Sequence, residues 1–208
     1  MSESFLRRAL NGHVLDQEQA RSVFEEMSRG ELSEIEIAAF LGALHARGEQ
    51  PSEIAGAAEA FRSAAQHFTT TAPDVIDVVG TGGDGVGTIN ISTASAFVAA
   101  SMGLKVAKHG NRAVSSKAGA ADLVEAAGIP LDLSPASSAK LLERTGFCFL
   151  FAQKYHPAMR YVAPVRGALK NPTIFNLIGP LVNPAPLSYQ VLGVGKPELL
   201  DVVAKALA

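Results

Sequence analysis

From residue 74 onward, the sequence alternates short apolar segments with stretches of helical character. The segments that predict strands are Val75–Val79, Leu104–Lys108, Phe147–Phe151 and Gln190–Val194. Each is bounded by glycine or polar residues, as buried strands usually are. Helices are expected to begin near Ser92, Gly119, Ser134 and His156. Because strands that alternate with helices form a mainly parallel sheet covered by helices, the sequence predicts an α/β fold.

The first 70 residues have a different pattern, which predicts helices alone. Apolar residues recur at positions i, i+3, i+4 and i+7 within residues 20–27, 37–44 and 54–61. Two pairs have the spacing of helix capping boxes: Asp16 with Gln19, and Ser33 with Glu36. We therefore predict a small N-terminal helical domain over residues 1–70 and a larger α/β domain over residues 71–208.

Composition narrows the classes of protein and ligand. The chain has 208 residues, of which 48% are apolar, and every apolar run is too short to span a bilayer. Cys148 is the only cysteine, and no signal peptide is apparent, so we expect a cytoplasmic protein without membrane contact. Residues 1–70 carry 11 acidic and 6 basic side chains, whereas residues 71–208 carry 9 and 12. This small positive excess suits a small anionic ligand and is too weak to indicate nucleic acid.

A glycine-rich segment, VVGTGGDGVGTINIST, connects the first predicted strand to the first predicted helix of the α/β region. Glycines at this position let the backbone approach a ligand closely, and the following helix N-terminus favours an anion. A merely tight turn between strand and helix is the alternative interpretation. The spacing also satisfies the dinucleotide-binding pattern, but Lys105, Lys108 and His109 stand where an acid for the ribose hydroxyls is expected. The Gly-Lys-Ser/Thr triplet of a P-loop and the partner motifs of protein kinases are absent from the sequence.

Asp84 distinguishes this loop from those phosphate loops. A carboxylate there would repel a bare phosphate, but it suits a pyrophosphate that carries a divalent cation. Asn90, Ser92 and Thr93 follow with short polar side chains suited to phosphate oxygens or to the waters of Mg²⁺. Ser92 or Thr93 also has the character of a helix N-cap, and both roles are compatible.

A second polar cluster, KHGNRAVSS, follows the second predicted strand and should emerge at the same edge of the sheet. It supplies Lys108 and Arg112 as cations, with Lys117 directly after it, and Ser115 and Ser116 as hydroxyl donors. Three cations beside a loop that contains an aspartate predict a clamp for a pyrophosphate with its metal. We interpret His109 as a positioning residue rather than a base.

Four motifs, in this order and spacing, resemble those of the anthranilate phosphoribosyltransferase family: GTGGDG, NISTASAFVAA, KHGNRAVSS and FNLIGPLVNPA. The resemblance covers essentially the whole chain. It implies the fold type shared by nucleoside phosphorylases and these phosphoribosyltransferases. It also implies transfer of the phosphoribosyl group from phosphoribosyl pyrophosphate to anthranilate in tryptophan biosynthesis, with Mg²⁺ as cofactor and a homodimer as the assembly.

The resemblance also implies site residues. Those for the phosphoribosyl donor are Gly80, Gly83, Asp84, Thr88, Asn90, Ile91, Ser92, Thr93, Lys108, His109, Gly110, Asn111, Arg112, Ala113, Val114, Ser115, Ser116 and Ala120. Those for anthranilate are Gly80, His109, Asn111 and Arg166, and Ser92 also contacts the metal. The chemistry needs no protein nucleophile, because the aromatic amine attacks directly. Lys108 and Arg112 would instead stabilise the departing pyrophosphate by charge and position.

The sequence departs from the family pattern in two places. Ala120 stands where the family usually has serine, and one lost neutral hydrogen bond would weaken donor binding by about 1 kcal/mol. No Asp-Glu dipeptide occurs in the sequence, although the family holds its metals with such a pair beyond the region matched here. We therefore expect these 208 residues to be part of a longer chain, with an α/β domain incomplete at its C-terminus. Alone, they should bind the donor weakly and turn over little.

Three other functions compete with this interpretation. A non-catalytic relative of the same fold could bind nucleic acid through a basic groove, which would give strongly salt-sensitive binding. A pyrimidine nucleoside phosphorylase shares the architecture and also acts at an anomeric carbon. A nicotinamide-dependent dehydrogenase is the third alternative, based on the glycine spacing alone.

Overall fold

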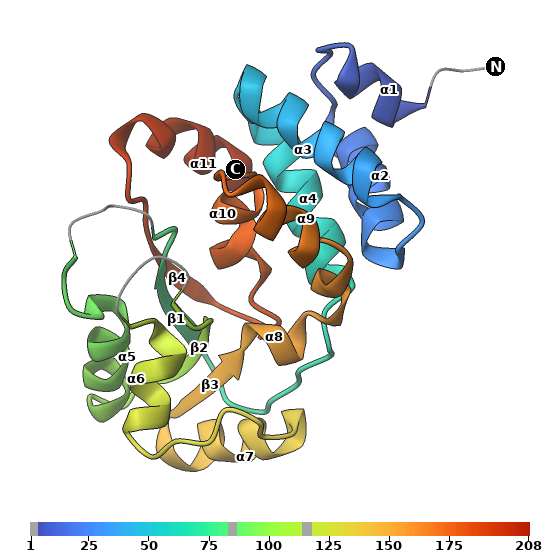
Figure 1. The fold of residues 1–208 in the computed structure, drawn as a ribbon. Coiled ribbons are helices and arrows are strands. Elements are labelled where there is room, and N and C mark those ends of the chain that lie inside the picture. Colours follow the sequence, from blue (N-terminus) through green and yellow to red (C-terminus); the bar gives the residue numbers. More distant parts are fainter. Residues whose placement is uncertain (1–3, 83–86, 114–117) are drawn as a thin grey trace. The chain divides into compact units, whose positions relative to one another are not determined.

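The computed structural model describes residues 4–82, 87–113 and 118–208 (Figure 1). The predicted site residues Gly83, Asp84, Val114, Ser115 and Ser116, and Lys117 of the predicted cationic clamp, lie outside these ranges. The described chain divides into two compact units. One unit, mainly helical, comprises Met1–Ala65, His156–Val182 and Pro197–Ala208, and the other comprises Gln66–Tyr155 and Asn183–Lys196. The predicted domain boundary after residue 70 stays a prediction.

The second unit contains a four-stranded sheet in the order β3-β2-β1-β4, and every described pairing is parallel. The sheet confirms the prediction of a mainly parallel α/β fold. Its strands are β1 (Val75–Gly80), β2 (Lys105–Gly110), β3 (Phe147–Phe151) and β4 (Tyr189–Gly193). Its helices are α5 (Ile91–Ser101), α6 (Ala120–Ala126), α7 (Pro135–Thr145) and α8 (Ala152–Tyr155).

Alternation along the strands gives the sheet two apolar faces. On one face, α5 and α6 pack on residues of β2 and β3 (Figure 1). The buried residues of that face are Ala96, Val106, Ala121, Val124, Leu131, Phe147 and Phe149. The opposite face packs against α7, and its core is Phe68, Val75, Ala107, Ala139, Leu142, Cys148, Leu150, Tyr155 and Ala185. Over β2 and β3 both faces are covered, so polar groups of these strands can reach solvent mainly at the strand ends, whereas alternate residues of β4 are exposed.

The bounds of β2 differ from the prediction in a way that matters for the site. The strand was expected to end at Lys108, but its pairing with β3 continues through His109 and Gly110. Lys108 and His109 are therefore buried in the sheet rather than part of the loop that follows it. The start of α5 also differs, because Asn90 is its N-cap residue and Ser92 and Thr93 lie in its first turn.

The helical unit contains the predicted amphipathic helices. Both capping boxes are present, with Asp16 capping α2 and Ser33 capping α3. The helices of this unit are α1 (Phe5–Leu10), α2 (Gln17–Arg29), α3 (Glu34–Arg47), α4 (Pro51–Ser63), α9 (Ala163–Leu169), α10 (Phe175–Ile178) and α11 (Leu200–Leu207). Three short 3-10 helices complete it: η1 (Pro157–Tyr161), η2 (Gly179–Val182) and η3 (Pro197–Leu199).

Four phenylalanines form the centre of the helical unit. The rings of Phe24, Phe40, Phe61 and Phe175 contact one another edge to face, with centroids 4.9 to 6.4 Å apart. Such aromatic pairs add to the stabilisation that comes from burial alone. Phe175 belongs to a segment distant in sequence from the first four helices, so this core joins residues from two of the three segments of the unit.

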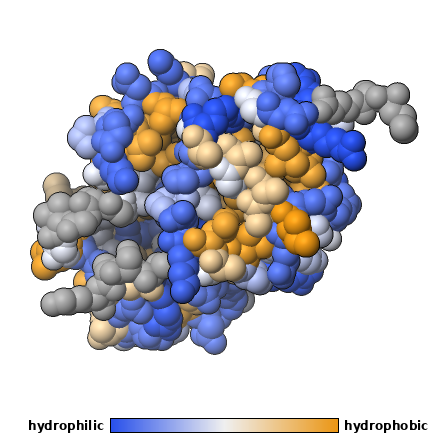
Figure 2. Space-filling view, turned by 45° about the horizontal axis from the view of Figure 1, so that its top comes forward, coloured by the Kyte–Doolittle hydropathy of each residue, from blue (hydrophilic) through white to orange (hydrophobic). Residues whose placement is uncertain are grey.

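The surface drawn in Figure 2 mixes apolar side chains with hydrophilic ones. Several large apolar side chains are exposed in the helical unit, including Phe5, Leu10, Val14 and Ile35. Within the described ranges, no helix combines the length and the apolar character that crossing a membrane requires.

Candidate functional site

The carboxyl ends of β1, β2 and β4 lie at one edge of the sheet, because all these strands run parallel. The first residues after β1 are held against β4. The Thr81 N–H donates to the Gly193 carbonyl (2.9 Å), and the Thr81 hydroxyl accepts a hydrogen bond from the Gly195 N–H (3.0 Å). At Gly80 a side chain would meet the Gly193 carbonyl at 3.3 Å, and Gly82 has a φ of +68°. The glycines thus permit a close turn at this edge.

The N-terminus of α5 lies after the glycine-rich loop. Asn90 does not cap the helix with its side chain; its amide instead donates to the Gly119 carbonyl at 3.2 Å. Thr88 is exposed, Ser92 is half-buried and Thr93 is buried. The first turn of this 11-residue helix directs backbone N–H groups and a positive dipole end toward the loop. This is an environment that favours an anion.

Lys108 lies beneath this edge rather than on it. Its side chain is 2% exposed, and its ammonium donates to the Val78 carbonyl at 2.7 Å. Burial lowers the pKa of Lys108, and nearby Asp77 partly opposes that effect. Its positive charge is therefore enclosed in the sheet and can attract an anionic ligand at the sheet edge only at a distance, without direct contact.

Asp77 forms a buried polar group beside Lys108 that the sequence did not suggest. Its Oδ2 accepts hydrogen bonds from the side-chain amides of Asn183 (2.9 Å) and Gln190 (3.5 Å). The Asn183 amide also donates to the Ala107 carbonyl at 2.9 Å. Burial raises the pKa of Asp77, although the Asn183 contact and the charge of Lys108 oppose the shift. These contacts join β1, β2 and the segment that leads to β4.

The residues after His109 turn away from the strand toward α6. His109 is 4% exposed, which agrees with a positioning role, although that role stays a prediction. The Asn111 side-chain oxygen accepts hydrogen bonds from the Arg112 N–H (2.8 Å) and from the Gln153 amide (3.3 Å). Ala120 is the first residue of α6 and is half-buried. Asn111 therefore links the residues after β2 to α8.

Among the site residues that the structure describes, Arg112 is the cation whose side chain reaches solvent, with 42% of that side chain exposed. Its Nη1 donates to Asp122 at 2.9 Å and to Glu125 at 2.8 Å, and its Nη2 donates to Glu125 at 3.0 Å. Its guanidinium also lies 5.8 Å from the centre of the Phe151 ring. The two carboxylates raise the pKa of Arg112 further above its ordinary range, so the side chain is charged at any physiological pH.

Arg166 belongs to the helical unit, whereas Gly80, His109 and Asn111 belong to the α/β unit. Its guanidinium lies 5.5 Å from the centre of the Phe175 ring and makes a long contact of 3.5 Å with the Asn176 side chain. Burial lowers the pKa of Arg166. The predicted anthranilate residues are thus divided between the two units.

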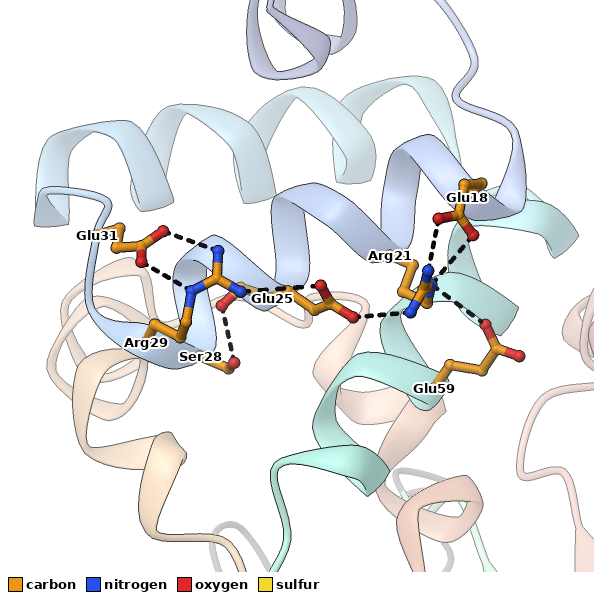
Figure 3. Close-up of polar contacts among 7 residues, drawn as sticks. All are labelled: Glu18, Arg21, Glu25, Ser28, Arg29, Glu31 and Glu59. Atoms are coloured by element: carbon orange, nitrogen blue, oxygen red, sulfur yellow. Dashed lines mark hydrogen bonds and ion pairs between the residues drawn. The ribbon is translucent and has the colours of Figure 1, made fainter.

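A second group of charged residues lies on α2 and α4 (Figure 3). It surrounds an open polar hollow of about 350 Å³ lined by Glu18, Arg21, Glu59, Arg62 and Ser63. Arg21 pairs with Glu18 and, at 3.0 Å, with Glu25. Because these charges neutralise one another and are largely exposed, the hollow lacks the unbalanced charge that an ionic ligand needs. No group of three or more His, Cys, Asp or Glu side chains with the geometry of a metal site occurs in residues 4–82, 87–113 and 118–208.

Comparison with known proteins gives consistent similarities. The family model for the helical bundle domain of the glycosyl transferase family matches residues 3–65, and the model for its a/b domain matches residues 72–208. The chain is 51% identical over 202 residues to the anthranilate phosphoribosyltransferase of Aeromonas hydrophila subsp. hydrophila, covering 97% of this chain and 59% of that protein. It is 49% identical over 212 residues to that of Thermomicrobium roseum, covering 100% and 60%.

Solved structures agree with these relatives. The crystal structure of anthranilate phosphoribosyltransferase from Thermus thermophilus has a TM-score of 0.94 at 49% identity, with 99% of this chain and 62% of that chain covered. The enzyme from Saccharomyces cerevisiae in complex with PRPP and Mg has a TM-score of 0.89 at 31% identity, covering 99% and 61%. The resemblance seen in the sequence motifs is confirmed, and the chain spans about three fifths of the length of the relatives it matches.

Proposed function

The chain belongs to the glycosyl transferase family, and on that premise we propose that it transfers the phosphoribosyl group of phosphoribosyl pyrophosphate to the amine of anthranilate. The products would be N-(5-phosphoribosyl)anthranilate and pyrophosphate, formed in tryptophan biosynthesis. The observation that carries this proposal is the edge of the sheet where the β1 loop, the α5 N-terminus and Arg112 lie on neighbouring elements. The similarity to anthranilate phosphoribosyltransferases supplies the identity of the substrates.

We assign the donor to the residues named for it in the sequence. The described parts of that site are Gly80, Thr88, the first turn of α5 with its N-cap over Asn90–Thr93, the segment Lys108–Ala113 and Ala120. Gly83, Asp84 and Val114–Ser116 complete the assignment. The mixture of backbone N–H groups, hydroxyls and one exposed guanidinium suits a ligand with many anionic oxygens.

Departure of pyrophosphate leaves positive charge on the ribose and negative charge on the leaving oxygens. Arg112 and the N–H groups of α5 would stabilise those oxygens, and Lys108 would add charge from beneath the sheet edge. The neutral aromatic amine needs positioning at the anomeric carbon rather than activation by a base. No side chain has to form a covalent bond in this scheme.

Arg166 suits the carboxylate of anthranilate. Its guanidinium is half-buried, and among the described residues its hydrogen-bond contact is the long one to Asn176. A planar fork with free donors binds a carboxylate through two parallel hydrogen bonds. Together with Gly80, His109 and Asn111, this residue forms the proposed anthranilate set.

The donor set fits Mg²⁺ that arrives on the pyrophosphate. Such a cation usually keeps several waters and takes one or two protein oxygens besides the phosphates. Ser92, in the first turn of α5, is the residue proposed to contact Mg²⁺. Asp84 is proposed to interact with the pyrophosphate of the donor through that cation. Bound there, Mg²⁺ would supply positive charge that lowers the cost of separating pyrophosphate from ribose.

We further propose a cytoplasmic homodimer in which the N-terminal domain, residues 1–70, provides the interface and residues 71–208 provide the catalytic domain. The exposed apolar side chains Phe5, Leu10, Val14 and Ile35 support an interface on that domain.

Calorimetric titration of the chain with phosphoribosyl pyrophosphate and Mg²⁺ tests the proposal. We expect saturable binding that ribose 5-phosphate, which lacks the pyrophosphate, does not reproduce. Chromatography should then detect N-(5-phosphoribosyl)anthranilate after anthranilate is added, formed slowly, because these residues alone are expected to turn over little. Absence of donor binding, or turnover of thymidine with phosphate in place of anthranilate, would contradict the proposed function.

A further inference from the structure

The Asp122 carboxylate joins two points of the chain that are six residues apart. Its Oδ2 accepts hydrogen bonds from the Gly119 N–H (2.7 Å) and from the Ala113 N–H (3.1 Å). Its Oδ1 accepts a third from Arg112 Nη1 (2.9 Å). A single side chain therefore binds both described ends of the segment after β2 and the exposed arginine at its start.

The backbone segments around this carboxylate are closely packed. A side chain at Gly119 would lie 2.3 Å from the Ala113 nitrogen and 2.5 Å from the Arg112 carbonyl carbon. The backbone at Gly119 is thus in contact with the backbone at Arg112 and Ala113, and only glycine permits that approach. The Ala121 N–H donates to the Asn111 carbonyl at 3.1 Å, which fastens the start of α6 to the same segment.

The same point also connects the two predicted donor clusters. The Gly119 carbonyl accepts the hydrogen bond of the Asn90 amide, and Asn90 is the N-cap residue of α5. Asp122 thus holds Gly119 from its N–H side while Asn90 holds it from its carbonyl side. The first turn of α5 and the Arg112 segment are linked through these two residues.

We propose that Asp122 is a positioning residue of the donor site, which fixes Arg112 and the Ala113 backbone relative to the N-terminus of α5. This proposal rests on the proposed function, because the ligand that benefits is the pyrophosphate of the donor. Asp122 does not touch that ligand in this account. Its backbone hydrogen bonds, and then its contact with Arg112, lower its pKa, which keeps it ionised in neutral solution.

Glu125 provides a natural comparison. It also pairs with Arg112, through two hydrogen bonds of 2.8 and 3.0 Å, and 53% of its side chain is exposed. Its described contacts are with the guanidinium and not with the loop backbone. If the carboxylates served only to neutralise Arg112, removing either charge would strengthen the attraction of the site for an anion. If Asp122 positions the segment, removing its charge should weaken donor binding, whereas removing that of Glu125 should not.

The test compares Asp122→Asn, Asp122→Glu and Glu125→Gln in the 208-residue chain, with phosphoribosyl pyrophosphate and Mg²⁺ as the calorimetric probe. Asp122→Asn should weaken donor binding by about tenfold, because misplaced binding groups lose most of their benefit. Asp122→Glu keeps the charge but moves the oxygens, and it should also weaken binding. Glu125→Gln should leave donor affinity unchanged or raise it by up to about fivefold, since it removes only an exposed ion-pair partner.

Amide hydrogen exchange measured without ligand provides a readout that does not depend on the donor. The Ala113 and Gly119 amides should exchange faster in Asp122→Asn and at the wild-type rate in Glu125→Gln. Equal effects of Asp122→Asn and Glu125→Gln on affinity, or unchanged exchange in Asp122→Asn, would overturn the positioning role. Failure of the wild-type chain to bind the donor would instead overturn the proposed function. The exchange rates then decide whether Asp122 anchors the segment.

Discussion

The helical unit and the α/β unit each contain a carboxylate that accepts hydrogen bonds from two backbone N–H groups and from an arginine. In the helical unit, Glu53 binds the Leu15 N–H and the Gln50 N–H, both at 3.1 Å, and Arg47 at 2.6 Å. In the α/β unit, Asp122 makes the corresponding set with backbone groups and Arg112. The hydrogen-bonding chemistry of the two groups is nearly the same.

Burial makes these two groups different. The Glu53 side chain is 0% exposed and that of Arg47 is 21% exposed, whereas the values are 32% for Asp122 and 42% for Arg112. A buried pair of charges has no water to replace a lost partner, so its loss damages the fold. An exposed arginine can exchange a carboxylate for a phosphate oxygen at small cost. The first group therefore stabilises the fold, whereas the second orders the donor site in the proposed function.

The largest expected effect is that of Glu53→Gln. It would leave Arg47 without its buried partner, and breaking such a pair usually costs about 3–5 kcal/mol. Urea unfolding followed by circular dichroism measures the change. Glu31→Gln is the matched control, because Glu31 pairs with Arg29 at 2.7 Å while both side chains are about half exposed. The control should leave the unfolding midpoint unchanged. Equal shifts of the midpoint in Glu53→Gln and Glu31→Gln would show that burial does not determine how much each ion pair stabilises the fold.

The next effect concerns close packing within the helical unit. A side chain at Gly56 of α4 would lie 2.4 Å from the Gln17 carbonyl oxygen and 2.7 Å from the Arg21 nitrogen. Because these are backbone atoms, Gly56→Ala should destabilise the fold by about 1–3 kcal/mol. Gly42→Ala in α3 meets nothing within 4 Å and should stabilise the fold by about 0.5–1 kcal/mol. Stability changes of the same sign in Gly56→Ala and Gly42→Ala would contradict this packing.

A pH dependence of stability should originate in the helical unit. Burial lowers the pKa of His156 to about 4, although hydrogen bonding to the backbone at Phe61 and Val182 opposes the shift. The unfolded chain therefore binds a proton near pH 6.5, whereas the folded chain does so only near pH 4. The free energy of unfolding is therefore highest above the His156 pKa of the unfolded chain. It declines as the pH falls from that pKa toward the pKa of the folded chain. Between pH 8 and pH 5 the loss should be about 2 kcal/mol.

Urea unfolding at these two pH values measures that loss. His156→Gln should remove this part of the pH dependence, whereas His13→Gln, at an exposed position, should retain it. A wild-type chain that is equally stable at pH 8 and pH 5 would contradict the assignment.

Much of the fold was predictable because it depends on local patterns. Phe147–Phe151 has the same bounds in the sequence prediction and in the structure. The helices predicted to begin near Ser92, Gly119 and Ser134 begin within one residue of those positions. The extension of β2 to Gly110 was not predictable, since it depends on pairing with β3 and on burial of two polar residues. The region near His156 forms η1 before α9, where a single helix was expected.

The arrangement of the site was less predictable from the sequence than the fold. Residue types indicated an anion site, but not that Lys108 is enclosed while Arg112 is exposed, because exposure depends on how far each strand is paired. Asp122 did carry a local signal, since it stands three residues after Gly119, the N-cap residue of α6. Its bonds to Ala113 and Arg112 cross the loop, and no spacing rule reveals them. Asp77 and Asn183 are joined across 106 residues of sequence for the same reason.

The central claim is that the donor binds at the sheet edge of the α/β unit, while the corresponding polar group of the helical unit only supports the fold. The most direct test is a backbone amide NMR titration of the chain with phosphoribosyl pyrophosphate and Mg²⁺. We expect the amides of Gly80–Gly82, Asn90–Thr93 and Gly110–Ala113 to shift, while those of Leu15 and Gln50 beside Glu53 do not. Shifts at Leu15 and Gln50, with none at the ends of β1 and β2, would contradict the account.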